Sequence, residues 1–297
     1  MKHFINTLKV VVFLLAGSLY AQQEPNYALY QYTMNVINPA YAGADGQTSF
    51  AANLRSQWEG VKDAPETQSL FFATPLGNRV GIGLSVVNDA TFIERKTGYF
   101  VDFSYKVPIS AQTNVFLGLK AGGDTYSLDT NNLANLGFPQ DPAVQNIDDG
   151  FKPNVGIGAY LHNEKYFLSL SAPSLLSADR VDVSNGSVTN KNTHVYLSGG
   201  YSFALGGETQ FKPSTMARYV SGAPISVDIT AAFRFLDKLE LGVLYRTDNA
   251  LGGIAKFELH DWLDIGYGYE SSLTSEISNV SRGTHEIFIR FNIANEK

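Results

Sequence analysis

The chain has 297 residues, and its 22 basic and 28 acidic side chains give a net charge of −6. Charged residues make up only 17% of the chain, against about 25% in soluble domains, and aromatic residues take part of their place. The acidic balance excludes a nucleic-acid partner, and the absence of cysteine excludes disulfide scaffolds and thiol catalysis. No apolar run beyond the N-terminus reaches the roughly 18 residues of a membrane-spanning helix, which excludes a helical membrane protein.

The N-terminus carries the pattern of an export signal. Lys2 and Lys9 flank a short apolar run at residues 10–16, and small residues lead to Ala21. This order is typical of a secretory signal peptide, so we predict that residues 1–21 are removed. Residues 22–47 do not alternate cleanly but are rich in tyrosine and turn residues. We expect this N-terminal segment to pack on the domain that follows, along its periplasmic rim or in its interior.

From residue 48 onward, apolar and polar residues alternate with a period of two, most clearly at 80–86 and 225–235. Such alternation predicts strands with one apolar and one polar face, and the segments reach the about 9–11 residues of a membrane-spanning strand. We therefore predict an all-β fold in which residues 48–297 form an antiparallel outer-membrane β-barrel of about fourteen strands. The strands are expected at 48–58, 64–75, 79–89, 96–108, 113–127, 151–162, 165–174, 193–205, 208–220, 224–236, 238–247, 250–260, 262–272 and 284–294.

The connections between these strands differ in length in a regular way. Those after even-numbered strands are short, whereas several after odd-numbered strands are long, at 88–95, 128–150, 175–192 and 273–283. Short periplasmic turns on one rim and long surface loops on the other are typical of outer-membrane barrels. Pro213, in the middle of segment 208–220, counts against a regular strand there. The alternative is a soluble secreted β-barrel or sandwich, for which shorter strands and more charge are expected.

If the apolar residues face lipid, the interleaved charged residues face the lumen. Both signs occur, so the lumen is expected either to receive a chain segment or solute, or to be filled by a ladder of ion pairs. The candidate lumen-facing or partner-facing residues are Asp102, Lys106, Asp228, Arg234, Glu240, Arg246, Lys256, Glu258, Asp264, Glu270, Glu286 and Arg290.

No motif for chemistry is present: HExxH, GxSxG and the P-loop are all absent. The acidic loop 141–149 lacks the ligand pattern of a calcium site. We predict no catalytic residue, metal or cofactor; a hydrolase would need a histidine and a carboxylate converging on one rim. The glycines at 81 and 83 and at 266 and 268 lie inside alternating segments, which indicates close approach of neighbouring strands.

One run of residues has a counterpart in a known family. Residues 38–43 read Asn-Pro-Ala-Tyr-Ala-Gly, and two short motifs follow at 58–60 and 64–67. In these positions the chain resembles the PorP/SprF family of type IX secretion system membrane proteins. The residues that carry the resemblance are Asn38, Pro39, Ala40, Tyr41, Ala42, Gly43, Trp58, Gly60, Pro65 and Thr67.

The resemblance implies an outer-membrane barrel that helps export, or anchors, large secreted surface proteins such as gliding adhesins through their C-terminal sorting domains. It also implies contact with other type IX secretion components, and for some members with the periplasmic ring. We predict a non-enzymatic barrel of this kind, with loops 128–150 and 175–192 facing the partner and the 38–43 motif setting the start of the first strand. The alternative is an outer-membrane channel for small or apolar solutes.

Overall fold

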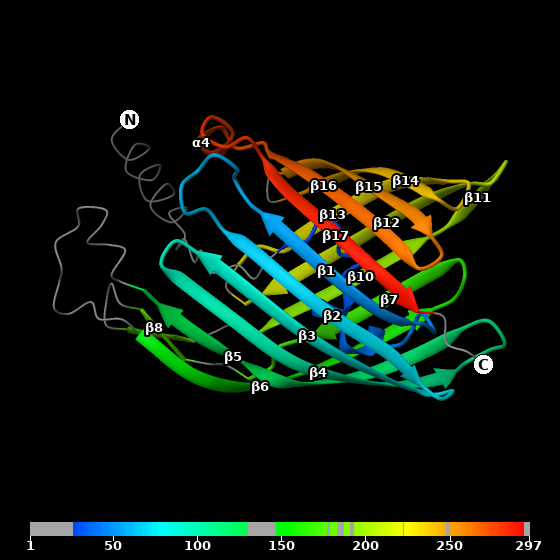
Figure 1. The fold of residues 1–297 in the computed structure, drawn as a ribbon, viewed down its shortest axis with the longest axis horizontal. Helices are drawn as coiled ribbons and strands as arrows, with labels where there is room; N and C mark the ends of the chain where they lie inside the picture. Colours follow the sequence, from blue (N-terminus) through cyan, green and yellow to red (C-terminus); the bar gives the residue numbers. More distant parts are fainter. Residues whose placement is uncertain are drawn as a thin grey trace, which may run out of the picture.

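The computed structural model describes residues 26–129, 147–176, 179–182, 187–190, 193–221, 223–247 and 250–293. They form one large antiparallel sheet (Figure 1). Its strands are β1 (Thr48–Ser56), β2 (Glu66–Leu76), β3 (Val80–Thr91), β4 (Glu94–Pro108), β5 (Asn114–Leu128), β6 (Ile147–His162), β7 (Tyr166–Ala172), β10 (His194–Tyr201), β11 (Phe203–Gly206), β12 (Thr209–Val220), β13 (Ser226–Phe235), β14 (Leu239–Arg246), β15 (Ala250–His260), β16 (Leu263–Ser272) and β17 (Thr284–Ile293).

The sheet closes on itself. Strand β1 pairs with β17, and β10 pairs with both β7 and β12, so the ring has no open break. Strands β10 and β11 are consecutive in the chain and both pair with β12, so together they occupy one position in the wall. The fifteen strands therefore fill fourteen positions. The predicted antiparallel barrel of about fourteen strands is confirmed. Among the residues described, no helix has the length and apolarity required to cross a bilayer.

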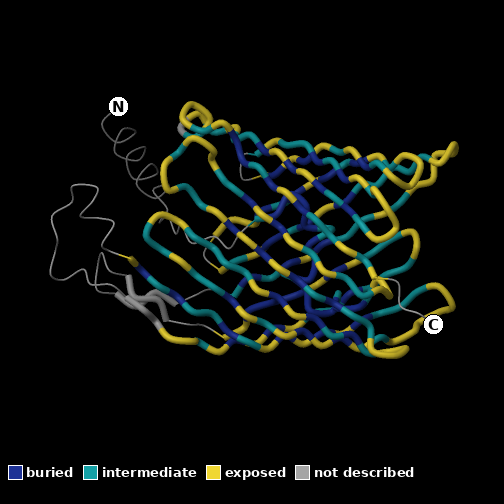
Figure 2. The backbone as a smooth tube through the Cα atoms, in the orientation of Figure 1, coloured by how far each residue is buried: buried dark blue, intermediate teal, exposed yellow. Residues whose placement is uncertain are grey.

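The wall is apolar outside and polar inside. On β4, Val101, Phe103 and Tyr105 are exposed, whereas Asp102 and Ser104 between them are buried. Figure 2 shows this alternation of exposed and buried residues along the strands around the barrel. A band of exposed aliphatic and aromatic side chains with polar residues inside is what a barrel in hydrocarbon requires.

The two ends of the barrel differ. At one end, here called the turn end, strands are joined by short turns such as 77–79 and 236–238. At the other, the loop end, the connection after β7 carries a small hairpin of β8 (Asp179–Asp182) and β9 (Ser187–Asn190), and the one after β16 carries helix α4 (Ser275–Ser278). The predicted long loop at 88–95 is wrong, because Thr91 pairs with Glu94 and β3 and β4 are joined by a two-residue turn.

Pro213 lies within β12 without ending it. It pairs in register with Ala231 of β13 on one side. On its other side the neighbouring strand is interrupted at Ser202, between β10 and β11. A proline lacks the N–H that a ladder needs, so it is tolerated where the facing strand is broken.

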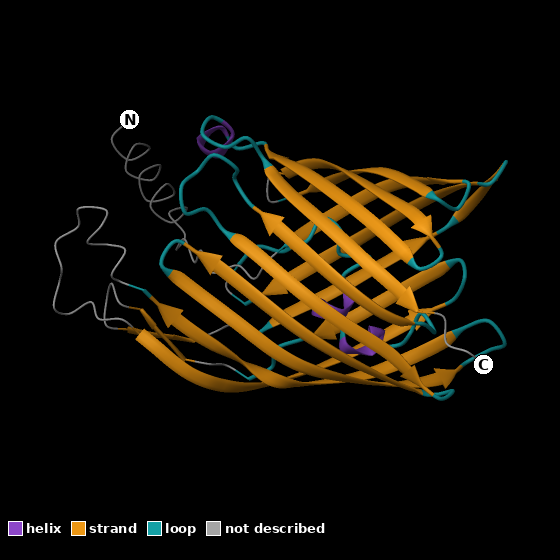
Figure 3. Cartoon of the chain, viewed as in Figure 1, coloured by secondary structure: helices purple, strands orange, loops and turns teal. Residues whose placement is uncertain are grey.

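Residues 26–44 lie inside the barrel, and residues 45–47 are exposed where the segment runs into β1 at the turn end. They form short turns, helix α2 (Met34–Ile37) and the 3-10 helix η1 (Pro39–Tyr41), which Figure 3 shows within the ring of strands. Ala28, Leu29, Tyr30 and Ala40 are almost fully buried. We call residues 26–47 the plug, residues 26–33 its strap and residues 34–47 its base.

The first prediction concerns a charge placed on the lipid-facing side of the wall. Leu119 on β5 is 60% exposed, whereas Ile109, in the turn after β4, is 63% exposed but lies beyond the strands. We expect Leu119→Arg to lower the stability of the barrel in lipid vesicles by about 2–4 kcal/mol, measured by denaturant unfolding, because a charge is then placed in hydrocarbon. The matched variant Ile109→Arg is expected to change it little, and an equal loss in both would contradict this orientation.

Candidate functional site: the plugged lumen

The base of the plug is bound to the wall through the 38–43 motif. The Asn38 side-chain amide donates to the Ala159 carbonyl at 3.0 Å and to Ser169 Oγ at 2.7 Å, and its Oδ1 accepts from the Ala40 amide at 2.9 Å. The hydroxyl of Ser104 donates to the carbonyl of Ala42 at 2.6 Å. The Asn38 side chain therefore satisfies the Ala40 amide and a wall carbonyl, and a wall serine satisfies the Ala42 carbonyl, as buried irregular backbone requires.

Glycines on the wall make room for the base. A Cβ added to Gly118 would lie 2.1 Å from the Ala40 nitrogen, and one added to Gly81 would lie 2.0 Å from the Ala42 carbonyl oxygen. Gly266 and Gly268 likewise face the strap: a Cβ added to Gly266 would lie 3.2 Å from Leu29, and one added to Gly268 would lie 3.1 Å from Ala28. Side chains of neighbouring strands lie close to the glycines of the prediction, such as Ser104 at 2.5 Å from a Cβ on Gly81, but the plug lies at least as close to each of them.

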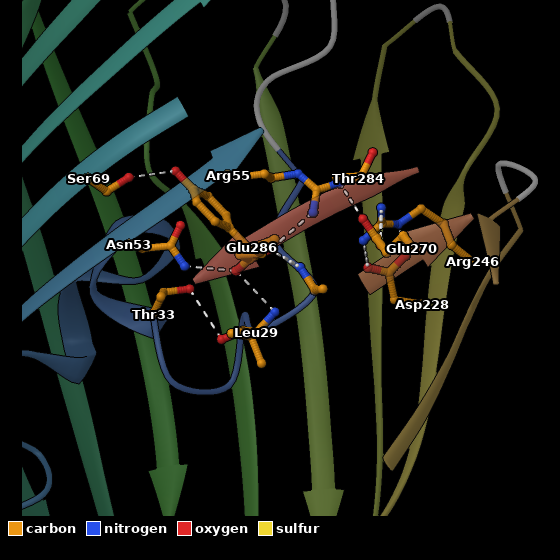
Figure 4. A network of polar contacts seen from close by, with 12 residues as sticks. Leu29, Thr33, Asn53, Arg55, Ser69, Asp228, Arg246, Glu270, Thr284 and Glu286 are labelled. Carbon is orange, nitrogen blue, oxygen red and sulfur yellow. Dashed lines mark hydrogen bonds and ion pairs between the residues drawn. The ribbon is translucent and has the colours of Figure 1, made fainter. Parts of the chain in front are cut away.

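The strap is held by a carboxylate and by hydroxyls. Glu286 on β17 accepts hydrogen bonds from the Ala28 amide at 2.7 Å and the Leu29 amide at 3.2 Å. The same carboxylate accepts from Asn53 at 2.8 Å and Arg55 at 3.0 Å, both on β1 (Figure 4). Charge-assisted bonds of this kind are about twice as strong as neutral ones. Glu286 therefore joins the strap to the wall.

Two strap tyrosines reach the opposite wall. Tyr30 donates from its hydroxyl to Ser214 on β12 at 3.0 Å, and Tyr32 donates to the Glu240 carboxylate on β14. Burial raises the pKa of both phenols above its usual range, and the Glu240 charge raises that of Tyr32 further. Both therefore stay neutral donors at physiological pH.

A network of ion pairs fills the lumen on the loop-end side of the strap. Arg55 pairs with Glu270 as well as with Glu286, and Arg246 binds Asp228 through two bonds of 2.7 and 2.8 Å. Arg246 also lies 2.8 Å from Glu270, which links the two pairs into one network (Figure 4). Each of these buried charges has a partner, which is the condition for tolerating it.

Further ion pairs lie on the turn-end side. Asp264 accepts from Arg290 at 2.9 Å and lies 3.3 Å from Lys256, while Lys212 lies 2.7 Å from Glu240. Across the lumen, Lys120 pairs with Asp102 at 2.8 Å and approaches the Asn35 carbonyl of the plug at 3.4 Å. The interior thus contains both a chain segment and a ladder of ion pairs, the two alternatives that the sequence left open.

The charged residues predicted for the lumen lie on strands, between outward apolar neighbours. Asp102, Asp228, Glu240, Arg246, Lys256, Asp264, Glu270 and Glu286 are buried, and Lys106, Arg234, Glu258 and Arg290 are half-buried. A role in contacting a partner stays a prediction for all of them.

The motif residues outside the plug gather near the loop end. Trp58 and Gly60 have positive φ angles of 50° and 91°, and the bend brings the backbone of Glu59 onto Gly283 and Arg282. The Pro65 carbonyl accepts from the Gln57 amide at 2.9 Å, and Thr67 donates to Asp89 at 2.7 Å. These residues join the first hairpin to its neighbours.

Arg55 and the lumen serines are site residues that the sequence analysis did not single out. Arg55 alternates with outward Leu54, so the period-two rule places it inside. An inward apolar patch of Ala232, Leu244, Ile254 and Phe288 was also missed. The same rule places Leu244, Ile254 and Phe288 inside, because they lie two residues from Arg246, Lys256 and Glu286.

A histidine and a carboxylate, the two groups that a hydrolase would need, lie together at one place on the rim. His285 lies 3.0 Å from Glu59 through Nε2 and 2.6 Å from the Tyr267 hydroxyl through Nδ1, near the loop end. In a serine-type hydrolase the nucleophile lies at Nε2 and the carboxylate at Nδ1, whereas here Glu59 lies at Nε2 and the Tyr267 phenol at Nδ1. Within the described ranges no cluster of metal-ligating side chains occurs. Of the acidic segment 141–149, residues 141–146 lie outside these ranges and residues 147–149 belong to strand β6.

The family is decided by the whole sequence. A family model described as "Type IX secretion system membrane protein PorP/SprF" matches residues 19–291, nearly the full chain. The chain belongs to the PorP/SprF family. Family membership and the closed, lipid-facing barrel make it an outer-membrane protein of the type IX secretion system, and the motif at 38–43 that carried the resemblance is the base of its plug. A search among curated proteins gave no match.

Several solved outer-membrane barrels are similar in outline to this family member. The toluene transporter TbuX of Ralstonia pickettii is 14% identical with a TM-score of 0.49, over 87% of this chain and 92% of its own. Omp33 of Acinetobacter baumannii is 10% identical with a TM-score of 0.47, over 83% and 98%. The NanC porin is 9% identical with a TM-score of 0.45, over 83% and 100%. The fold assignment rests on the strand pairing described above.

The glycine contacts make a second prediction. Gly118→Ala is expected to displace the base of the plug and to lower the free energy of unfolding by about 1–3 kcal/mol, because the new methyl group overlaps the Ala40 backbone. Thermal unfolding in detergent measures the loss, and hydrogen exchange at residues 40–42 locates it. Gly253→Ala is the matched control, since its nearest neighbour would lie at 3.7 Å. Unchanged exchange at residues 40–42 in Gly118→Ala would contradict the assignment.

Proposed function

We propose that this barrel holds, or helps export, a large secreted surface protein of the gliding-adhesin kind through the C-terminal domain of that protein. Family membership supports a role in type IX secretion, in contact with its other components. The observation that carries the proposal is the plug: the chain's own residues 26–47 cross the lumen and bond to both sides of the wall. A barrel built in this way serves as a rigid outer-membrane platform.

Recognition is assigned to the loop end. Loops on a rigid scaffold carry most binding functions, and by the rule for outer-membrane barrels the long connections face the cell exterior. The loops 128–150 and 175–192, both expected to face the partner, leave the barrel at this end. Most of their residues lie outside the described ranges.

The second candidate, a channel for small or apolar solutes, requires an open lumen. A channel needs a continuous polar path, whereas Leu29, Tyr30 and Phe288 are almost fully buried at mid-height. The plug would have to leave for solutes to pass.

Purification of the native protein from membranes in mild detergent tests the proposal. We expect a large secreted protein to co-purify in a fixed ratio, and the complex to give no conductance in a planar bilayer. Steady conductance or solute uptake by a barrel that brings no protein with it would establish the channel instead.

A loop variant tests where the partner binds. Replacing residues 131–145 by a short Gly-Ser linker is expected to lower co-purification of the secreted protein at least about ten-fold, since the lost contacts belong to the recognition surface. The unfolding temperature of the barrel should stay unchanged, because the replaced residues lie between β5 and β6 and outside the paired strands of the wall. The control replaces Gly206 and Gly207 in a turn at the opposite end by Asn-Gly, which should leave capture intact. Equal capture by both variants would contradict recognition by this loop.

A further inference from the structure

The place where the strap binds has the features of a peptide-binding site that belongs to the wall. Glu286 accepts the two consecutive backbone amides of Ala28 and Leu29, so it recognises main chain and not a particular side chain. Asn53 and Arg55 hold this carboxylate in place from β1. Its position is therefore fixed by the wall, whatever lies against it.

Beside Glu286 the wall forms an apolar pocket, which is unusual for the interior of a barrel. Ala232, Leu244, Ile254 and Phe288, on four different strands, are buried around the side chain of Leu29. Elsewhere the inward positions are mainly polar. Gly266 and Gly268, next to the pocket, have no side chain, so a peptide backbone can lie close to the wall there. Small apolar pockets with a few fixed polar groups are the general form of a ligand site.

Hydroxyl and carboxylate groups on either side of the pocket complete the site. Ser69 lies 3.1 Å from the Tyr27 hydroxyl, and Ser214 accepts from Tyr30 and from Gln31 at 3.0 and 2.5 Å. The strap thus offers a small residue followed by a branched aliphatic one, between tyrosines. Nothing in these contacts requires that the segment belong to the same chain.

The base is held differently. Its backbone lies against wall glycines that leave no room for a side chain, and it leads directly into β1. The strap, by contrast, is joined to the first strand only through the base. Tyr27 and Tyr30 of the strap share one buried cluster with Met34 and Ile37 of the base, so exchange of the strap opens this cluster. The base keeps its close backbone contacts with the wall glycines, which are about 1 Å tighter than those of the strap.

We propose that Glu286 and the pocket of Ala232, Leu244, Ile254 and Phe288 form a binding site for an extended polypeptide segment, which the strap occupies in cis and a partner segment of similar pattern occupies in its place. Exchange releases residues 26–33 toward the loop end and admits the partner's chain to the lumen. That this partner is the secreted surface protein rests on the proposed function; the site itself does not.

Cysteine labelling measures the exchange directly, because the chain has no cysteine of its own. Ala28 in the strap is 3% exposed and Ala42 in the base is 1% exposed, so Ala28→Cys and Ala42→Cys are matched reporters. The full-length variants are treated with a maleimide in detergent, with and without a synthetic peptide of the sequence of residues 26–33. We expect the peptide to raise the labelling rate of A28C several-fold and to leave A42C unchanged. The same peptide with aspartate in place of leucine should have no effect.

A change in the wall gives a second readout. Combined with each reporter, Glu286→Gln is expected to speed labelling of A28C about ten-fold, since the strap loses charge-assisted bonds, and to leave A42C unchanged. Faster labelling at both positions would mean that the barrel loosens as a whole, and an unchanged A28C rate with saturating peptide would mean that the strap does not exchange; either result overturns the proposal. No step uses the secreted protein, so failure here and failure of co-purification remain distinct.

Discussion

The closure of the sheet between β1 and β17 is the constraint on which the rest of the structure depends. In hydrocarbon an unpaired backbone group costs several kcal/mol, so a β-sheet persists there only as a ring without edges. Closing the ring fixes the direction of every side chain at once. Outward positions must be apolar to meet lipid, and inward positions enclose a space that water, ions or protein must fill.

In this barrel, protein fills the middle of that space. The plug brings backbone amides and carbonyls into the lumen, and wall side chains such as Glu286, Ser104 and Ser171 satisfy them. Buried arginines and carboxylates pair with one another across neighbouring strands, as Arg246 does with Asp228. Removing one member of such a pair leaves an uncompensated buried charge, which is far more costly than losing a surface ion pair. The same groups that stabilise the interior therefore also hold the strap in position.

The plug also explains physically why the motif at residues 38–43 has the residues it has. Asn38 and Ala40 can approach the wall only because Gly118 and Gly158 lack a Cβ, so motif and glycines depend on one another although they lie far apart in sequence. Mutual dependence of this kind is what keeps one arrangement far more stable than its alternatives. The two parts of the plug are also held differently, because the base backbone lies tightly against wall glycines and is hydrogen-bonded to the wall, whereas a carboxylate and an apolar pocket hold the strap.

The sequence by itself determined the barrel, because alternation with a period of two, strand length and a polar interior are local properties that any closed membrane sheet must show. It placed the strands of the described ranges close to their observed ends and the charged residues on the inner face. It left undetermined what contact between distant segments decides. Gly81 and Gly118 look alike in any strand pattern, and only the folded chain shows that residues 38–43 lie against them. The contacts that position the plug join residues about 60 to 260 positions apart, and the pairing of Arg55 with Glu270 and Glu286 and the pocket around Leu29 join residues more than 200 apart, so no local pattern encodes them.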